Sequence, residues 1–228
     1  MKKPVVDYRT FRLSKINDPQ FSHLKFLLGW VGYFALYILT ENVIPREKCY
    51  VVHCWLDDVI PFCEAFVIPY VFWYLLVFGS LLYFLFYNVD SFKKLSTFII
   101  ITQVVAMIIY ILFPNRQDLR PAEFDRDNIL TQLVGLLYTV DTNTNVCPSL
   151  HVGFSLALAS VWTKEKEASR GWKIFVIIAV ILICMSTAFI KQHSVVDAFV
   201  ALVMCLFAEY FVYGKTYWYE RIKRKKKS

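Results

Sequence analysis

Residues 147–163 read CPSLHVGFSLALASVWT, a short polar motif that passes at once into an apolar run. A second polar motif, Lys-Gln-His at residues 191–193, also stands at the start of an apolar run. Each motif places a histidine, His151 or His193, on the first turn of a predicted helix that then enters a membrane. Two histidines at two helix starts indicate a reaction centre.

The start of a helix is a binding site for anions, because its first N–H groups lack partners and its dipole carries roughly half a positive charge. Ser149 precedes one of these helices and is of a residue type preferred at the N-cap. Its hydroxyl and backbone would face the same anion. The two motifs therefore predict a site for phosphate or a similar group.

His193 and Asp197 are four residues apart, a spacing that brings two side chains together on a helix, with Cβ atoms about 5–6 Å apart. An aspartate there can hold the imidazole in one tautomer and stabilise its charged form. A carboxylate one turn inside a membrane costs about 2.5–3.5 kcal/mol without a partner, so Asp197 needs one. We expect His193 to be the nucleophile and His151 to act as the acid.

The composition predicts an integral membrane protein. Of 228 residues, 57% are hydrophobic, above the roughly 45–50% of soluble domains. The net charge of +7 could suggest nucleic acid, but the basic residues cluster between apolar runs and at the two ends of the chain. That distribution fits lipid headgroups and membrane topology, and we expect no nucleic-acid partner.

The apolar runs predict an all-α bundle of six transmembrane helices in a single domain, residues 1–228. The run at residues 129–140 is too short to cross a hydrocarbon core, which needs about 20 residues. It predicts an interfacial or re-entrant helix before the fourth span. The predicted spans are residues 24–40, 66–87, 95–113, 149–163, 172–190 and 193–213, followed by a basic cytoplasmic tail at residues 214–228.

Loop charge predicts the orientation, because Lys and Arg are enriched on the cytoplasmic side. With six spans both termini share one side, and most of the basic residues fall there. Both termini are therefore expected in the cytoplasm. Spans four and six then begin on the outer face, which places both histidines there with Arg120 and Lys191. Separately, Arg120 could belong to a plain loop turn and Lys191 could be a snorkelling anchor; together beside the histidines they indicate an anion site.

The cysteines and the remaining histidines give weaker signals. Cys184 and Cys205 lie inside apolar runs and read as small core residues. His23 and His53 have no converging ligands, so we expect no metal site and no cofactor. A disulfide is an open possibility among four cysteines predicted on the outer side, namely Cys49, Cys54, Cys63 and Cys147.

At these motifs the sequence resembles the type 2 phosphatidic acid phosphatase superfamily, whose six-span membrane enzymes build their site from three motifs. The resemblance covers roughly residues 56–213. The family's Pro-Ser-Gly-His motif corresponds to Pro148-Ser149-Leu150-His151. Its Ser-Arg-x5-His-x3-Asp motif corresponds to Ser186-Thr187, His193 and Asp197, and its Lys-x6-Arg-Pro motif to Arg120-Pro121 alone.

Two family cations are missing from their usual places. Phe113 stands at the position of the first-motif lysine, and Thr187 at that of the third-motif arginine. Lys191 and Arg116 are the available substitutes, which gives Arg120, Ser149, Lys191 and Arg116 as the expected phosphate-binding residues. The Ser-Leu-His and Lys-Gln-His forms look like the branch that holds inositol phosphorylceramide synthase-like transferases and many bacterial lipid phosphatases.

The resemblance implies a metal-independent lipid phosphatase that works through a phosphohistidine, with phosphatidic acid, phosphatidylglycerol phosphate or a polyprenyl diphosphate as substrate. One alternative is a transferase that passes the phosphoryl or phospho-headgroup to another alcohol. A second is a non-catalytic lipid transporter or binder on the same scaffold. The expected location is a bacterial cell membrane with the site on the extracytoplasmic face, and the sequence leaves the oligomeric state open.

Overall fold

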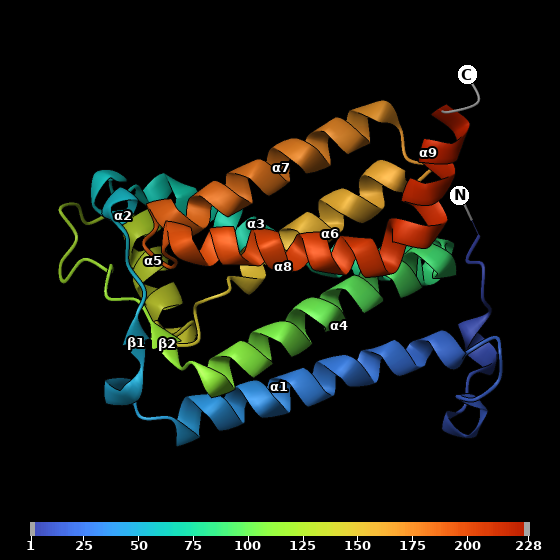
Figure 1. Ribbon diagram of the computed structural model, residues 1–228, viewed down its shortest axis with the longest axis horizontal. Coiled ribbons are helices and arrows are strands. Elements are labelled where there is room, and N and C mark those ends of the chain that lie inside the picture. Colours follow the sequence, from blue (N-terminus) through green and yellow to red (C-terminus); the bar gives the residue numbers. More distant parts are fainter. Residues whose placement is uncertain (1–2, 226–228) are drawn as a thin grey trace.

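The computed structural model describes residues 3–225, apart from the side chains at positions 41, 42, 216, 224 and 225. It is almost entirely helical, and the long helices run side by side along the longest axis (Figure 1). The principal helices are α1 (Phe26–Val43), α3 (Val67–Tyr87), α4 (Val89–Leu112), α6 (Leu150–Lys164), α7 (Arg170–Phe189) and α8 (Val195–Tyr213).

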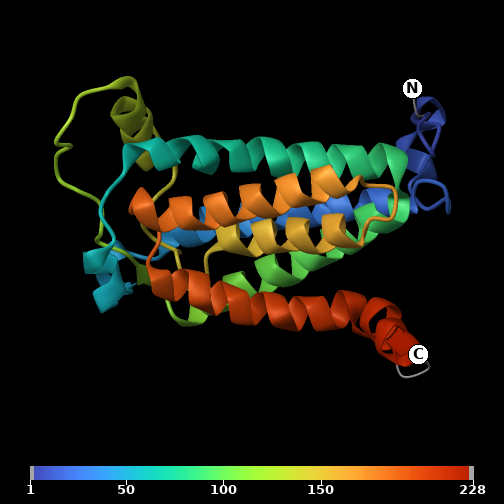
Figure 2. The same ribbon diagram turned by 90° about the horizontal axis from the view of Figure 1, so that it is seen from above.

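Shorter elements cap the two ends of this bundle. One end carries both chain termini, and the opposite end carries α2, α5 and the two short strands in both views (Figures 1 and 2). The short elements are the helices α2 (Trp55–Val59), α5 (Ile129–Val140) and α9 (Tyr219–Lys225), the strands β1 (Tyr50–Val51) and β2 (Asn115–Arg116), the 3-10 turns η1 (Tyr8–Thr10), η2 (Leu13–Lys15), η3 (Ser22–Lys25), η4 (Arg46–Lys48) and η5 (Glu64–Phe66), and the π-helical turn η6 (Gly214–Trp218).

Five segments of the described chain are long and apolar enough to cross a membrane. They agree in place with five of the predicted spans. The sixth, α6, has 15 residues and is shorter than the other five, although it lies where the fourth span was predicted. The five segments are Ser22–Thr40, Glu64–Tyr87, Val89–Leu112, Arg170–Phe189 and Val195–Tyr213.

Two predicted boundaries were wrong. Helix α4 begins at Val89 rather than residue 95, because the Asn88 side chain accepts a hydrogen bond from the Ser91 N–H at 3.1 Å and starts the helix early. Helix α8 begins at Val195, so His193 lies in the turn before the helix rather than on its first turn. The predicted tail continues as helix through η6 and α9; its residues 226–228 lie outside the described part.

Helix α6 lies at the centre of the bundle, where it packs against α3, α4, α7 and α8. Gly153 permits its close approach to α8, because a Cβ atom there would lie 3.3 Å from the Met204 Cε atom. Small residues at helix contacts are the usual means of packing helices in lipid, where burial from water contributes little. The central position of α6 explains why it is mostly buried although short.

Asn115 fixes the loop that carries the first motif. Its Oδ1 accepts hydrogen bonds from the N–H groups of Val146 and Cys147 at 2.9 and 2.8 Å, and its Nδ2 donates to the Cys147 carbonyl at 2.9 Å. The Tyr110 hydroxyl donates to the carbonyl of Pro148, which follows a cis peptide bond, at 2.7 Å. These bonds hold residues 145–149 against α4, so His151 enters α6 from a fixed loop.

Candidate active site

His151 and His193 come together at the end of the bundle opposite the termini. Their ring centroids are 5.6 Å apart, with the ring planes inclined at 59°. His151 is the second residue of α6, whereas His193 follows α7 in the turn that leads to α8. The sequence motifs that carry the two histidines therefore meet in one site, close enough for both rings to contact one small group.

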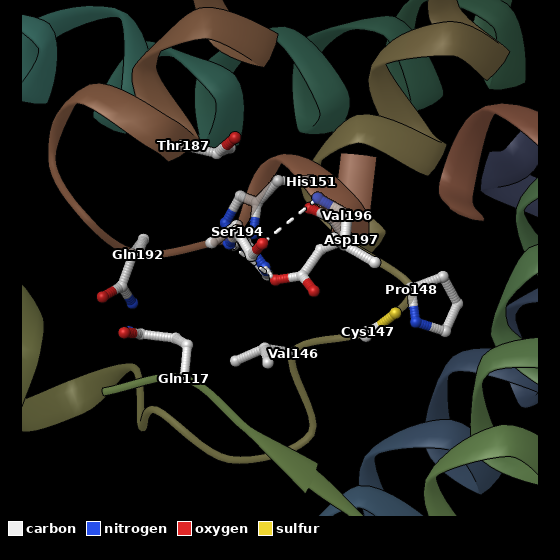
Figure 3. Close-up of polar contacts among 12 residues, drawn as sticks. Gln117, Val146, Cys147, Pro148, His151, Thr187, Gln192, Ser194, Val196 and Asp197 are labelled. Atoms are coloured by element: carbon white, nitrogen blue, oxygen red, sulfur yellow. Dashed lines mark hydrogen bonds and ion pairs between the residues drawn. The ribbon is translucent and has the colours of Figure 1, made fainter. Parts of the chain in front are cut away.

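Asp197 holds His193. The Nδ1 atom of His193 lies 3.1 Å from the Asp197 Oδ2 atom, and the Asp197 side chain is fully buried. The same oxygen accepts a hydrogen bond from the Ser194 N–H at 2.9 Å (Figure 3). Because a carboxylate can only accept, His193 must donate from Nδ1, and the lone pair of its Nε2 is left available as a nucleophile.

Ser149 is the N-cap residue of α6 and, contrary to the expectation that it would bind phosphate, it is not among the residues that line the cavity at the two histidines. Its hydroxyl oxygen accepts a hydrogen bond from the Val152 N–H at 3.4 Å, as the N-cap expectation requires, and the residue is fully buried. Its own N–H donates to the backbone carbonyl of Asp197 at 3.1 Å. Ser149 therefore ties the start of α6 to the first turn of α8 and fixes the spacing of the two histidines.

The start of α8 already has an anion of its own. Asp57, in α2, accepts hydrogen bonds from the Ser194 hydroxyl at 2.6 Å and the Val195 N–H at 2.8 Å. Burial would raise the pKa of Asp57, but these bonds and one from the Cys54 N–H hold it below its ordinary value. Asp57 and Asp197 thus occupy the helix start that was expected to bind phosphate.

Aromatic rings enclose His151 on the side of α3. Its ring centroid lies 4.3 Å from that of Trp73, 4.5 Å from that of Tyr70 and 6.2 Å from that of Tyr74. The His151 Nδ1 atom is 3.5 Å from the Tyr70 hydroxyl. The Nε2 atom is buried and has no hydrogen-bond partner among the described residues.

Asp141 is a second carboxylate that the sequence interpretation missed. The Tyr70 hydroxyl makes a very short hydrogen bond to its Oδ2 atom. Burial raises the pKa of Asp141, but nearby His151 and the hydrogen bond from Tyr70 more than offset this, so the pKa lies below its ordinary value. Asp141 directly follows the short apolar helix α5. A carboxylate placed where an apolar run ends was the sequence signal that could have identified Asp141 as a site residue.

Arg120 lies beside the site but does not line it. Its Nη1 and Nη2 atoms donate to the carbonyls of Tyr138 and Asp141 at 3.0 and 2.5 Å, and its guanidinium stacks 4.4 Å from the Tyr138 ring. Burial lowers its pKa. These carbonyls end helix α5, so Arg120 caps that helix and holds the backbone of Asp141.

The other two expected cations point elsewhere. The Lys191 Nζ atom donates to the carbonyls of Asp57 and Ile60 at 2.7 and 2.5 Å, in the segment around α2. Burial lowers the pKa of Lys191. Arg116 forms an ion pair with Asp118 at 3.1 Å. Each cation already satisfies a carbonyl or carboxylate of its own chain, and neither faces the histidines.

A cavity of about 840 Å³ opens at the two histidines. Its polar end is formed by residues of the loops at the end of the bundle opposite the termini, and the rest is apolar and aromatic. The described residues that line it include no Lys or Arg. The polar lining consists of Asp141, Thr142, Thr144, Asn145, Gln192, His151 and His193, together with tyrosine hydroxyls from α1, α3 and α4.

The apolar part of the cavity lies between α1 and α3 and follows the long axis of the bundle. Trp73 lines it near His151, and Leu85 lines it near the opposite end. Twelve helical residues separate these two positions, a rise of about 18 Å at 1.5 Å per residue. That length matches about half of a hydrocarbon core of roughly 30 Å. The cavity can therefore hold a chain as long as one membrane leaflet.

Within the described residues, no group of three or more His, Cys, Asp or Glu side chains is arranged to hold a metal ion. Cys54, Cys63 and Cys147 carry free thiols, so no disulfide joins any two of these three residues. His53 pairs with the exposed Asp58 at 2.8 Å, away from the cavity.

Comparison with known proteins found no matching family model, no matching curated protein and no matching solved structure. The interpretation of the site therefore depends on its geometry and on the motifs of the sequence.

Proposed function

We propose that this chain is a metal-independent membrane lipid phosphatase, which hydrolyses a phosphomonoester or diphosphate lipid through a phosphohistidine. One observation carries the proposal. Two imidazoles lie 5.6 Å apart at the mouth of an apolar cavity, and one of them is held by a buried carboxylate. This is the arrangement of a nucleophile and a separate proton donor on either side of one phosphorus atom.

In the first step, the Nε2 lone pair of His193 attacks phosphorus and the bond from phosphorus to the lipid oxygen breaks. His151, protonated at Nε2, gives its proton to that departing oxygen. Asp197 accepts the Nδ1–H of His193 and stabilises the positive charge that the ring acquires on phosphorylation. The products of this step are the lipid alcohol and a phosphohistidine.

In the second step, water attacks the phosphohistidine. His151, now neutral, removes a proton from the water at Nε2, and the bond between His193 and phosphorus breaks. Phosphate leaves, and both histidines return to their starting state. Histidine is the side chain whose proton gain and loss lie closest to neutral pH, which suits a residue that acts first as acid and then as base.

The apolar cavity supports a lipid substrate. A chain seated between α1 and α3 would bring a headgroup to the histidines without leaving the bilayer. A cavity of this length and composition does not suit a soluble phosphate ester, because its walls are apolar over nearly the whole depth of a leaflet.

A transferase of the inositol phosphorylceramide synthase type is the second candidate. The described lining lacks Lys and Arg, so the cavity suits a phosphodiester with one negative charge better than a phosphomonoester with two. Apolar walls also restrict water, which favours a lipid alcohol as the acceptor. The chemistry at His193 and His151 is the same in both candidates, and only the second nucleophile differs.

The membrane placement follows from the same proposal. We infer six spans with α6 as the fourth, both termini in the cytoplasm, and a bacterial cell membrane as the location. Helix α6 is about 22 Å long at 1.5 Å per residue, so a site at its start would lie below the extracytoplasmic surface. Helix α5 would lie over this site at the interface, where its amphipathic character fits.

The deciding experiment is an assay of purified protein in lipid nanodiscs with chelator present. Free phosphate is measured with phosphatidic acid, phosphatidylglycerol phosphate and a polyprenyl diphosphate. A parallel arm offers a phosphodiester lipid with a labelled lipid alcohol and looks for a labelled phospholipid. We expect an acid-labile, base-stable phosphoprotein in either active arm.

The matched variants are His193→Ala and His53→Ala, because both histidines belong to the same end of the molecule. We expect the first to abolish turnover and phosphoprotein, and the second to leave both unchanged. Full activity in His193→Ala would exclude the mechanism. Lipid binding without turnover in either arm would favour a non-catalytic transporter or binder instead.

A further inference from the structure

The environment of His151 differs from that of His193, and the difference assigns two residues a role. We propose that Tyr70 and Asp141 are positioning residues, which hold His151 as the Nδ1–H tautomer and so leave the lone pair on Nε2. This inference rests on the proposed function, since it concerns the proton donor of that site. It adds a second carboxylate, reached through a tyrosine, to the carboxylate that holds His193.

Three groups form a chain from His151 to the outer loop. His151 Nδ1 lies 3.5 Å from the Tyr70 hydroxyl, and that hydroxyl contacts Asp141 Oδ2 through a short hydrogen bond. Tyr70 is fully buried in α3, and its ring also packs against the His151 ring at 4.5 Å. The imidazole therefore has its orientation set by both a ring contact and a hydrogen bond.

The direction of each hydrogen bond follows from counting protons. An ionised carboxylate has no proton, so Tyr70 must donate its single hydrogen to Asp141. The tyrosine oxygen can then only accept from His151, which must carry its hydrogen on Nδ1. Neutral His151 consequently presents a lone pair at Nε2, the atom without a partner among the described residues.

Asp141 is itself held in place from the backbone. Its carbonyl accepts from Arg120 Nη2 at 2.5 Å and from Gln192 Nε2 at 3.3 Å. Arg120 is half-buried beside the site and does not line the cavity. The cation expected to bind phosphate thus serves to fix the residue that orients the acid.

The two carboxylates suit the two different tasks of the histidines. Asp197 touches His193 directly and so stabilises the charge that remains on a phosphorylated ring. Asp141 acts on His151 through the intervening Tyr70 hydroxyl. Because the carboxylate is farther from the ring, it attracts protonated His151 less strongly than a carboxylate in direct contact would. A histidine that must first give and then take a proton benefits from this looser arrangement.

The first test observes the tautomer directly by nitrogen NMR of isotope-labelled histidine in nanodiscs. The chain has four histidines, so single substitutions assign the His151 signals. At a pH where the ring is neutral, we expect Nδ1 protonated and Nε2 unprotonated. In Tyr70→Phe and Asp141→Asn we expect a mixture of both tautomers. An Nε2–H tautomer in the unmodified protein, or an unchanged tautomer in both variants, would overturn the proposal.

The second test is kinetic. We expect Tyr70→Phe and Asp141→Asn each to lower kcat about 10- to 100-fold, the usual effect of losing the partner that orients an imidazole, with KM within about threefold. Tyr138→Phe is the matched control, because its hydroxyl donates to the Ile190 carbonyl at 2.5 Å rather than to a histidine. Equal losses in all three variants would indicate a purely structural role and reject the proposal.

The pH at which His151 titrates is a third measurement, and a change in packing alone would not alter it. The titratable groups facing His151 are Tyr70 and Tyr74 on α3, Asp141 after α5, and His193 before α8. Removing the negative charge in Asp141→Asn should move the titration of His151 to lower pH. An unmoved titration would count against the proposal.

The NMR result separates this inference from the proposed function. If the tautomer shifts as expected but no phosphate release or transfer occurs, the positioning role stands and the reaction assignment fails. If the enzyme is active but neither tautomer nor kcat responds, the positioning role alone fails.

Discussion

The hydroxyl of Ser194 donates to the carboxylate of Asp57 at 2.6 Å, a contact between the N-cap of α8 and the short helix α2. Asp57 also accepts from the Val195 N–H, so it supplies the negative charge that a helix start favours. Because His193 directly precedes Ser194, this contact fixes the turn that carries His193, the proposed nucleophile. The loop between α1 and α3 thereby supports the site without touching the cavity.

Replacing Asp57 by Asn should destabilise the protein by about 1–3 kcal/mol, through loss of the cap and of charge-assisted hydrogen bonds. The measurement is unfolding in detergent followed by tryptophan fluorescence. Asp58→Asn is the control, because that neighbouring carboxylate is exposed and its ion pair in the described part of the chain is with His53. Equal stability of the two variants would contradict this role.

Asp57 also predicts a pH dependence of stability. Its pKa in the folded protein lies below the ordinary value of 3.8. Because this pKa is lowered by folding, ionised Asp57 contributes fully to the stability of the fold at a pH above its pKa in the unfolded chain. That contribution is lost as the pH falls through its pKa in the folded protein. Stability of the unmodified protein should therefore fall below about pH 4 more steeply than that of Asp57→Asn. Parallel pH curves would refute the assignment.

Asp197→Asn should lower kcat about 10³- to 10⁴-fold with little change in KM, because an amide no longer fixes the Nδ1–H tautomer of His193. Stopped assays of product formation measure it, together with the yield of phosphoprotein. The variant must retain the helical circular dichroism of the parent. A loss of less than tenfold would show that Asp197 does not orient the nucleophile.

The expected phosphate ligands Lys191 and Arg116 should have little effect on substrate affinity. Lys191→Met should lower stability by about 1–2 kcal/mol, because the carbonyls of Asp57 and Ile60 lose their donor. Arg116→Gln should cost less than about 1 kcal/mol, the usual value of a partly exposed ion pair. KM should change less than about threefold in both. A tenfold rise in KM would mean that these cations turn towards the substrate when it binds.

Leu82→Trp, in the cavity between α1 and α3, should raise KM for long-chain substrates more than for short-chain analogues of the same headgroup. The added ring fills space that the chain would occupy. Val104→Trp is the control, since Val104 is similarly exposed on α4 and does not line the cavity. Equal effects on long and short chains would remove the cavity from the substrate path.

Features that depend on local spacing were predictable. Long apolar runs gave the principal helices, because a chain in lipid must satisfy its backbone hydrogen bonds internally. The pairing of His193 with Asp197 was predicted from a separation of four residues, although helix α8 begins after His193. The Ser149 cap was likewise local. Each of these contacts lies within about one turn of the chain.

The partners of the charged side chains were not predictable. Lys191 and Arg120 were both expected beside the histidines, but the sequence gives no direction for a long side chain. The structure turns Lys191 to one loop and Arg120 to the end of α5. Both caps satisfy carbonyls that the ends of helices leave without partners.

By itself the sequence determined the helical bundle, the two histidine motifs and the local partner of His193. Only the tertiary structure decided that the imidazoles lie 5.6 Å apart, that Tyr70 links His151 to Asp141, and that the nearby cations serve backbone carbonyls. The physical reason is range. Helix formation and capping are set by neighbours along the chain, whereas contacts between distant segments are fixed by how the helices pack.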